Sequence, residues 1–109
     1  MVEARLSDTL LAFRLKRAEQ FARQWRTNAK RLQSLAADPR TPGLVRQDAL
    51  GEARMAVDIV SRRAGELVEL ALERGYGAWE ADPKIAPLLV EIRAVENALS
   101  FAIETLSRK

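Results

Sequence analysis

The sequence contains neither cysteine nor histidine, and these two absences narrow the chemistry open to the protein. Without cysteine there is no disulfide and no thiolate nucleophile, and without histidine there is no imidazole base near neutral pH. Zinc, haem and iron–sulfur sites are usually built from these two residue types. Carboxylates remain as candidate metal ligands, and they suit Mg²⁺ or Ca²⁺. We therefore expect a protein that is not an enzyme and that holds neither a cofactor nor a metal.

Long apolar runs are lacking as well. The longest nearly uncharged apolar stretch, Ile85–Val90, falls far short of the roughly 20 residues that a membrane-spanning helix needs. Residues Met1–Leu15 are charged and helix-periodic, which is unlike a secretory leader. We therefore expect a cytoplasmic protein with no membrane partner.

The length and composition are those of one globular domain, spanning residues 1–109, with 48% hydrophobic and 30% charged residues. The net charge of +3 is unevenly distributed. Residues 1–42 hold nine Lys or Arg against four Asp or Glu, which gives this segment a net charge of +5. The later segments are slightly acidic, because residues 43–75 hold five basic and six acidic residues and residues 76–109 hold four and five. The positive charge therefore belongs to the first segment.

Three segments share one apolar pattern, in which hydrophobic residues recur at alternating steps of four and three. This heptad pattern places one apolar stripe along a helix and directs it toward partner helices. The stripes are Leu11, Leu15, Ala18, Ala22, Trp25, Ala29, Leu32 and Ala36 in the first segment, Leu50, Ala53, Val57, Val60, Ala64, Leu67 and Ala71 in the second, and Leu88, Ile92, Val95, Leu99, Ala102 and Leu106 in the third.

The prolines and Gly75 mark the ends of the three expected helices. The run Asp-Pro-Arg-Thr-Pro-Gly at 38–43 stops the first helix, and Thr41 is expected to cap the second, with Pro42 at its first position. Gly75 is expected to end the second helix in a left-handed conformation. Pro87 fits the first turn of the third helix, after a turn at Asp82 and Pro83.

Three helices with short connections predict an all-α, antiparallel three-helix bundle. The first two helices, at about 32 residues, are about 48 Å long, whereas the third, at about 21 residues, reaches about 32 Å. A third helix that starts beside the beginning of the first should leave the far tip of the other two uncovered. This tip includes Leu32, Leu35, Leu44, Val45 and Ala49.

An uncovered apolar tip needs a partner, so we expect oligomerisation to complete the bundle. The expected oligomer interface comprises Leu32, Leu35, Leu44, Val45 and Phe101, the last lying with Val90 and Ala94 on a second face of the third helix. A second apolar flank of the first helix, which includes Phe13 and Phe21, is expected to pack against the third helix.

A basic stripe follows the first helix. Lys16, Arg23 and Lys30 fall seven residues apart, hence about 10 Å apart on one side of a helix, and Arg5 and Arg26 lie nearby. Such a row can contact a nucleic-acid phosphate backbone without reading its sequence. The alternative is a solvated face balanced by acidic residues of neighbouring helices.

Two aromatic residues, Tyr76 and Trp79, lie in the glycine-bearing connection after the second helix. If exposed, they could stack on a base or anchor a protein partner. The alternative is a hydrophobic plug that closes the end of the bundle.

One acidic pair bears on catalysis. Glu66 and Glu69 form a Glu-x-x-Glu pair, which is similar to the first half of the metal-binding motif of all-α nucleotide pyrophosphatases. The second acidic pair of that motif is missing, because Glu91 has no acidic residue three or four positions away. A Mg²⁺-dependent pyrophosphatase is therefore only a remote alternative.

These observations predict a non-catalytic structural or accessory subunit that assembles through apolar helix faces. In its more specific form, the basic stripe makes it a subunit of a nucleoprotein complex. We expect a homo-oligomer or a component of a larger complex, with no small-molecule substrate. A pure protein–protein interaction adaptor, or a phage-type assembly protein, is the alternative.

Overall fold

The computed structural model describes residues 8–108, and this part of the chain is almost entirely helical. It contains helix α1 at Asp8–Ala37, helix α2 at Gly43–Glu73 and helix α3 at Ala86–Ser107, with one 3₁₀ turn, η1, at Trp79–Ala81. No strand occurs between residues 8 and 108, so the expected all-α class is confirmed. None of these helices is long and apolar enough to cross a membrane.

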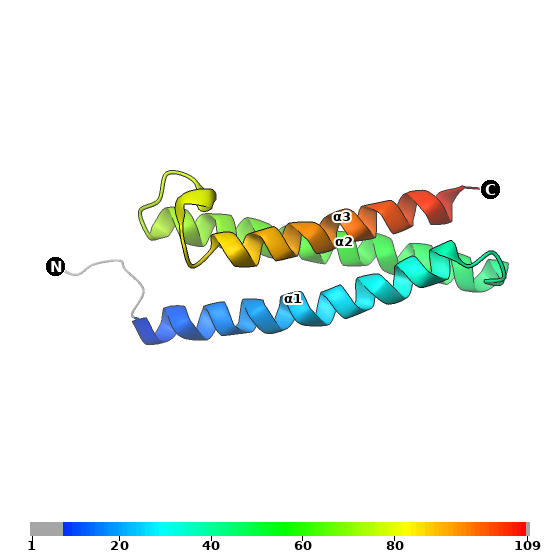
Figure 1. Ribbon diagram of the computed structural model, residues 1–109, viewed down its shortest axis with the longest axis horizontal. Helices are drawn as coiled ribbons and strands as arrows, with labels where there is room; N and C mark the ends of the chain where they lie inside the picture. The colour runs from blue at the N-terminus through cyan, green and yellow to red at the C-terminus, as the bar shows by residue number, and fades with distance from the viewer. Residues whose placement is uncertain (1–7, 109) are drawn as a thin grey trace.

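The three helices lie lengthwise beside one another in an elongated molecule of 61 × 23 × 18 Å (Figure 1). The connection 38–42 lies at the same end as the C-terminus, and the connection 74–85 lies at the opposite end (Figure 1). Helices α2 and α3 run as a close pair, while α1 diverges from them toward its beginning (Figure 1).

The core is formed by the three apolar stripes. All six stripe residues of α3 are buried, and the stripes of α1 and α2 contribute many alanines, which let neighbouring helices approach closely. Burying one large aliphatic side chain contributes about 1.5–3 kcal/mol relative to exposure. The largest fully buried aliphatic side chains are Leu32, Val60, Leu70, Ile85, Leu89, Ile92 and Leu99.

The connection between α1 and α2 differs from the expectation at Thr41 and at Pro42, which precedes the first helical position instead of occupying it. Helix α2 begins at Gly43 with Pro42 as its N-cap, and no side chain caps it. The hydroxyl of Thr41 instead donates a hydrogen bond of 2.9 Å to the backbone oxygen of Leu35. Thr41 therefore satisfies a carbonyl near the end of α1, and the prediction that it caps α2 is wrong.

The end of α2 agrees with the expectation for Gly75. This residue has φ +96°, in the left-handed region that favours glycine. Its N–H donates to the carbonyl of Leu72 at 2.9 Å, and the N–H of Tyr76 donates to the carbonyl of Ala71 at 3.1 Å. These two bonds form a Schellman motif, which satisfies carbonyls that the end of a helix leaves open.

The expected uncovered tip is largely absent. Leu32 and Ala49 are buried within the single chain, and the Arg46 guanidinium donates to the backbone oxygen of Thr105 at 3.4 Å. Helix α3 therefore reaches the far end of α2. The connection 74–85, which ends in the buried Ile85, packs against the other end of α2.

Only part of the predicted oligomer interface is thus left exposed at this tip. Leu44 is 78% exposed and Val45 is 39% exposed, whereas Leu35 is half-buried. Leu32 is fully buried, so the prediction that it belongs to an exposed interface is wrong.

Candidate polyanion-binding surface and interhelical groove

The basic stripe is present as an exposed row on α1. Lys16, Arg23 and Lys30 are exposed, and their side chains make no hydrogen bond or ion pair with other residues of the 8–108 range. Arg5 lies outside the described residues. The alternative interpretation requires acidic residues of neighbouring helices to balance these three cations, and no such ion pair is present within residues 8–108.

Arg26 differs from the rest of the stripe, because it forms an ion pair with Glu91 of α3. For this residue the alternative interpretation holds. Arg93 of α3 and Arg108, which follows α3, are also paired with a glutamate of this helix. The unpaired cations are therefore concentrated on α1, where they are Arg14, Lys16, Arg17, Arg23 and Lys30.

Lys84, which the sequence pattern did not place near the stripe, lies next to it. It precedes α3 and, together with Lys16 and Pro87, lines an open hollow between the beginnings of α1 and α3. A residue 68 positions away in sequence cannot be assigned to a surface by helix periodicity, because only the fold brings the two helices together.

The two aromatic residues of the connection 74–85 resemble a plug more than an open stacking platform. Trp79 is half-buried and packs against the core. Tyr76 is half-buried, with the Arg74 guanidinium 5.6 Å from its ring centroid.

A buried carboxylate, Asp82, holds this connection together, and the sequence pattern assigned it only to a turn. Its oxygens accept hydrogen bonds from Arg74, at 2.7 Å from Nε and 3.2 Å from Nη2. The backbone N–H groups of Lys84 and Ile85 also donate to Oδ1, at 3.0 and 3.4 Å. Asp82 therefore joins the end of α2 to the start of α3.

Burial raises the pKa of the Asp82 carboxyl, but the hydrogen bonds from Arg74, Lys84 and Ile85 outweigh this effect and hold the pKa below its ordinary value. The same ion pair raises the pKa of Arg74. Since both charges are satisfied within the chain, this pair has a structural role.

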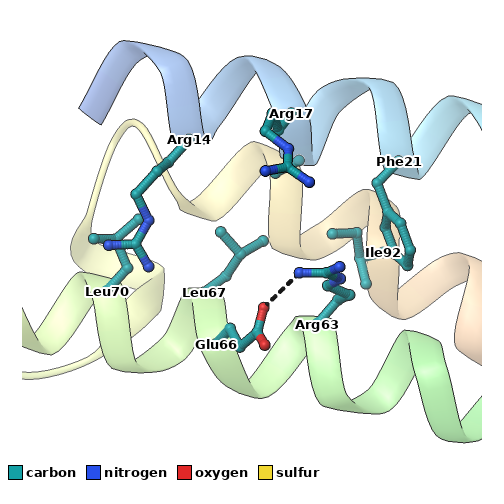
Figure 2. Close-up of a pocket in the computed structure, with 9 residues that line it drawn as sticks. Arg14, Arg17, Phe21, Arg63, Glu66, Leu67, Leu70 and Ile92 are labelled. Carbon is teal, nitrogen blue, oxygen red and sulfur yellow. Dashed lines mark hydrogen bonds and ion pairs between the residues drawn. The ribbon is translucent and has the colours of Figure 1, made fainter. Parts of the chain in front are cut away.

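A groove between α1 and α2 is the second surface feature (Figure 2). It encloses a cavity of about 190 Å³. Its apolar floor is formed by Ala18, Phe21, Leu67, Leu70 and Ile92, and its rim by Arg14, Arg17, Arg63 and Glu66. Figure 2 shows the Arg14 and Arg17 side chains extending from α1 toward α2.

The rim carries three positive charges and one negative charge. Arg63 donates to Glu66 at 3.0 Å, and its guanidinium lies 5.4 Å from the ring centroid of Phe21. Arg14 and Arg17 have no acidic partner within residues 8–108, although Arg17 lies 5.8 Å from the ring centroid of Phe13. The α1 side of the groove is therefore an unbalanced cationic surface.

The groove also corrects the expectation for the second apolar flank of α1. Phe13 is 57% exposed, and Phe21 lines the groove with α2 residues, so this flank does not pack mainly on α3. Helix α1 rests on α3 through its heptad stripe, which leaves the flank at the open side between α1 and α2.

The acidic pair Glu66 and Glu69 does not converge on this groove. Glu66 lines it and is paired with Arg63, whereas Glu69 is exposed and is not part of the lining. In the part of the chain that the structure describes, no three acidic residues come together to hold a metal ion.

The outer face of α3 is apolar and exposed. Val90 and Phe101, eleven residues apart and therefore on one side of the helix, are each 60% exposed. Exposed apolar residues gathered on one face are typical of protein contacts.

Comparisons with protein-family models, with curated proteins and with solved structures found no match to this chain.

Proposed function

We propose that the protein is a non-catalytic subunit of a larger assembly and that it binds a polyanion, such as a nucleic-acid backbone, through helix α1. The proposal includes an antiparallel three-helix arrangement that further helices complete. One observation supports it above the others: Lys16, Arg23 and Lys30 stand exposed in a row without any carboxylate partner in residues 8–108.

The spacing of the row suits a phosphate backbone. Residues seven apart on a helix are separated by about 10 Å along its axis, so the three cations can contact successive parts of one strand. Lys84 lines the same hollow as Lys16 and adds a cation on the α3 side, and Asp8 and Glu19 line this hollow as well. Because the contacts involve phosphates only, the expected binding is strong at low salt and indifferent to base sequence.

The test is fluorescence anisotropy with labelled single- and double-stranded DNA and RNA at two salt concentrations. Changing Lys16, Arg23 and Lys30 together to Gln should weaken binding about equally for all sequences and lower its salt dependence. A matched control changes Arg40, Arg54 and Arg62 to Gln, which removes the same charge from exposed positions outside α1. Absence of binding at low salt, or equal binding by both triple variants, would refute the proposal.

A protein-binding adaptor is the second candidate, and the exposed face of α3 favours it. Under this alternative the stripe variants behave like the unmodified protein, whereas Phe101→Asp abolishes the complex with the partner protein. Phe101 is exposed, so its replacement should leave the fold intact. Leu44 and Val45, at the start of α2, are exposed at the same end of the molecule as Phe101 and would enlarge such an interface.

A further inference from the structure

The two helices that flank the groove, α1 and α2, differ in net charge. Helix α1 carries seven basic and two acidic residues, whereas α2 carries four basic and six acidic residues. At one end the two sides meet, because Arg31 of α1 forms an ion pair with Glu52 of α2. This contact shows which sides of the two helices face each other.

The same two sides continue along the helices into the groove. Arg17 precedes Arg31 by fourteen residues and Glu66 follows Glu52 by fourteen, so each lies on nearly the same side of its helix as its counterpart. Arg17 and Glu66 both line the groove, but no ion pair joins them. Glu66 is paired with Arg63 on its own helix, and Arg17 has no carboxylate partner in the described residues.

Apolar side chains accompany these charges on the open face. Phe13 lies one turn before Arg17, and Ile59 lies two turns before Glu66; both are exposed. Glu73, seven residues after Glu66, is exposed and has no ion-pair partner between residues 8 and 108. The face therefore combines a basic and aromatic side on α1 with a side on α2 that carries Glu66, Glu73 and Ile59 and whose Arg63 is already paired with Glu66.

We propose that this face binds a second copy of the chain about a two-fold axis parallel to the helices, so that α1 of each copy lies on α2 of the other. In this arrangement Arg14 and Arg17 of each copy meet Glu66 and Glu73 of its partner. The proposal specifies the assembly surface of the function proposed above, and it rests on the antiparallel arrangement given there.

Charge complementarity favours this arrangement over a dimer in which the same two faces meet about a different two-fold axis. An axis perpendicular to the helices would place α1 on α1, which brings Arg14 and Arg17 close to their own copies. Like charges in contact across an interface are unfavourable, whereas opposite charges guide the partners together. A two-fold interface needs a self-complementary patch, and a face with one basic side and one acidic side provides it.

The dimer leaves the polyanion-binding stripe accessible. Lys16, Arg23 and Lys30 lie about 100–140° around α1 from Arg17 and about 60–100° from Phe13, so the stripe faces away from Arg17 and Phe13 lies between the two. Two copies would therefore present two such stripes on one particle.

Charge-reversal substitutions test the interface directly. One variant carries Arg14→Glu and Arg17→Glu, and a second carries Glu66→Arg and Glu73→Arg. By sedimentation velocity at about 100 µM, a concentration far above the Kd of a specific dimer, the unmodified protein should be a dimer. Each variant alone should be a monomer, with a dimer dissociation constant raised at least about a hundredfold by like-charge contacts. Mixed in equal amounts, the two variants should form a one-to-one heterodimer, because both sets of contacts become attractive again.

Controls separate loss of the interface from loss of the fold or of polyanion binding. Lys16→Glu with Arg23→Glu makes the same charge change on the other side of α1, so this variant should remain a dimer while losing binding to nucleic acid. Phe13→Asp, at an exposed position, should weaken the dimer without altering helix content measured by circular dichroism. An unmodified protein that is monomeric at about 100 µM would overturn the proposal, as would a mixture of the two variants that stays monomeric. Neither result would bear on binding of the stripe to nucleic acid.

Discussion

Replacing Asp82 tests whether one buried carboxylate holds the α2–α3 connection. It is the only charged residue among the buried residues of the described chain. Asp82→Ala removes the acceptor for the N–H groups of Lys84 and Ile85 and leaves the largely buried Arg74 side chain without its partner. Asp82→Asn retains an oxygen for the two N–H groups but loses the charge.

The expected losses follow from these contacts. Breaking a buried ion pair by removing one partner costs about 3–5 kcal/mol, and Arg74 can recover part of this by turning toward water. We therefore expect Asp82→Ala to lower the free energy of unfolding by about 3 kcal/mol, and Asp82→Asn by about 1.5 kcal/mol. For a domain of this size, the larger loss corresponds to a Tm lower by about 12–20 °C.

The assay is urea and thermal unfolding followed by circular dichroism, at one fixed protein concentration because association would contribute to stability. Asp58→Ala, on the exposed surface of α2, is the control and should change stability by less than about 0.5 kcal/mol. If Asp82→Ala were as stable as this control, Asp82 would not form the buried pair with Arg74, and the reasoning would be refuted.

The pH dependence follows from the lowered pKa of Asp82. A carboxyl group whose pKa is lower in the folded state stabilises the protein fully above its unfolded pKa of about 3.9, and this contribution is lost as pH falls through the folded value. Asp82→Asn has no such group. The stability difference between the unmodified protein and Asp82→Asn should therefore be constant from about pH 7 to 5 and shrink below about pH 4.

Two further substitutions test the helix end and the position of the core. Gly75→Ala should lower the free energy of unfolding by about 1 kcal/mol, because residue 75 has φ +96° and alanine is strained in that conformation, although no atom lies near the added Cβ. An unchanged midpoint in chemical unfolding would argue against the left-handed helix end. Leu32→Ala should cost about 3 kcal/mol because its side chain is fully buried, whereas Leu44→Ala should be nearly neutral. Equal effects of the two leucine substitutions would contradict the placement of α3 against the far end of α2.

The helices themselves were predictable from the sequence because their signals are local. Heptad spacing identified all six buried stripe residues of α3, and Gly75 was recognised because few other residues accept a positive φ. The Thr41 cap was not predictable in the same way. A threonine before a helix can bond forward to that helix or back to the preceding one, and only the geometry of the connection decides between them.

Long-range contacts were the part that the sequence could not supply. The uncovered tip was inferred from helix lengths alone, which do not reveal how far α3 slides along α2. Likewise, periodicity placed Lys16 and Arg26 on one surface of α1, but it could not tell that Glu91 of α3 pairs with Arg26 and leaves Lys16 unpaired. The position of Lys84 beside Lys16 depends on the same packing.

The apolar heptad pattern does not by itself determine the position of α3 along α2, and the Arg74–Asp82 pair helps to determine it. If α3 slid along α2 by seven residues, about 10 Å, leucines, valines and alanines would again face one another, because the pattern repeats with that period. The same displacement would separate Arg74 from Asp82 and leave a charge buried without its partner. Hydrophobic contacts therefore decide that the two helices associate, and the buried ion pair at the turn, together with the Ser61–Glu96 and Arg46–Thr105 hydrogen bonds, distinguishes the observed alignment from its shifted alternatives.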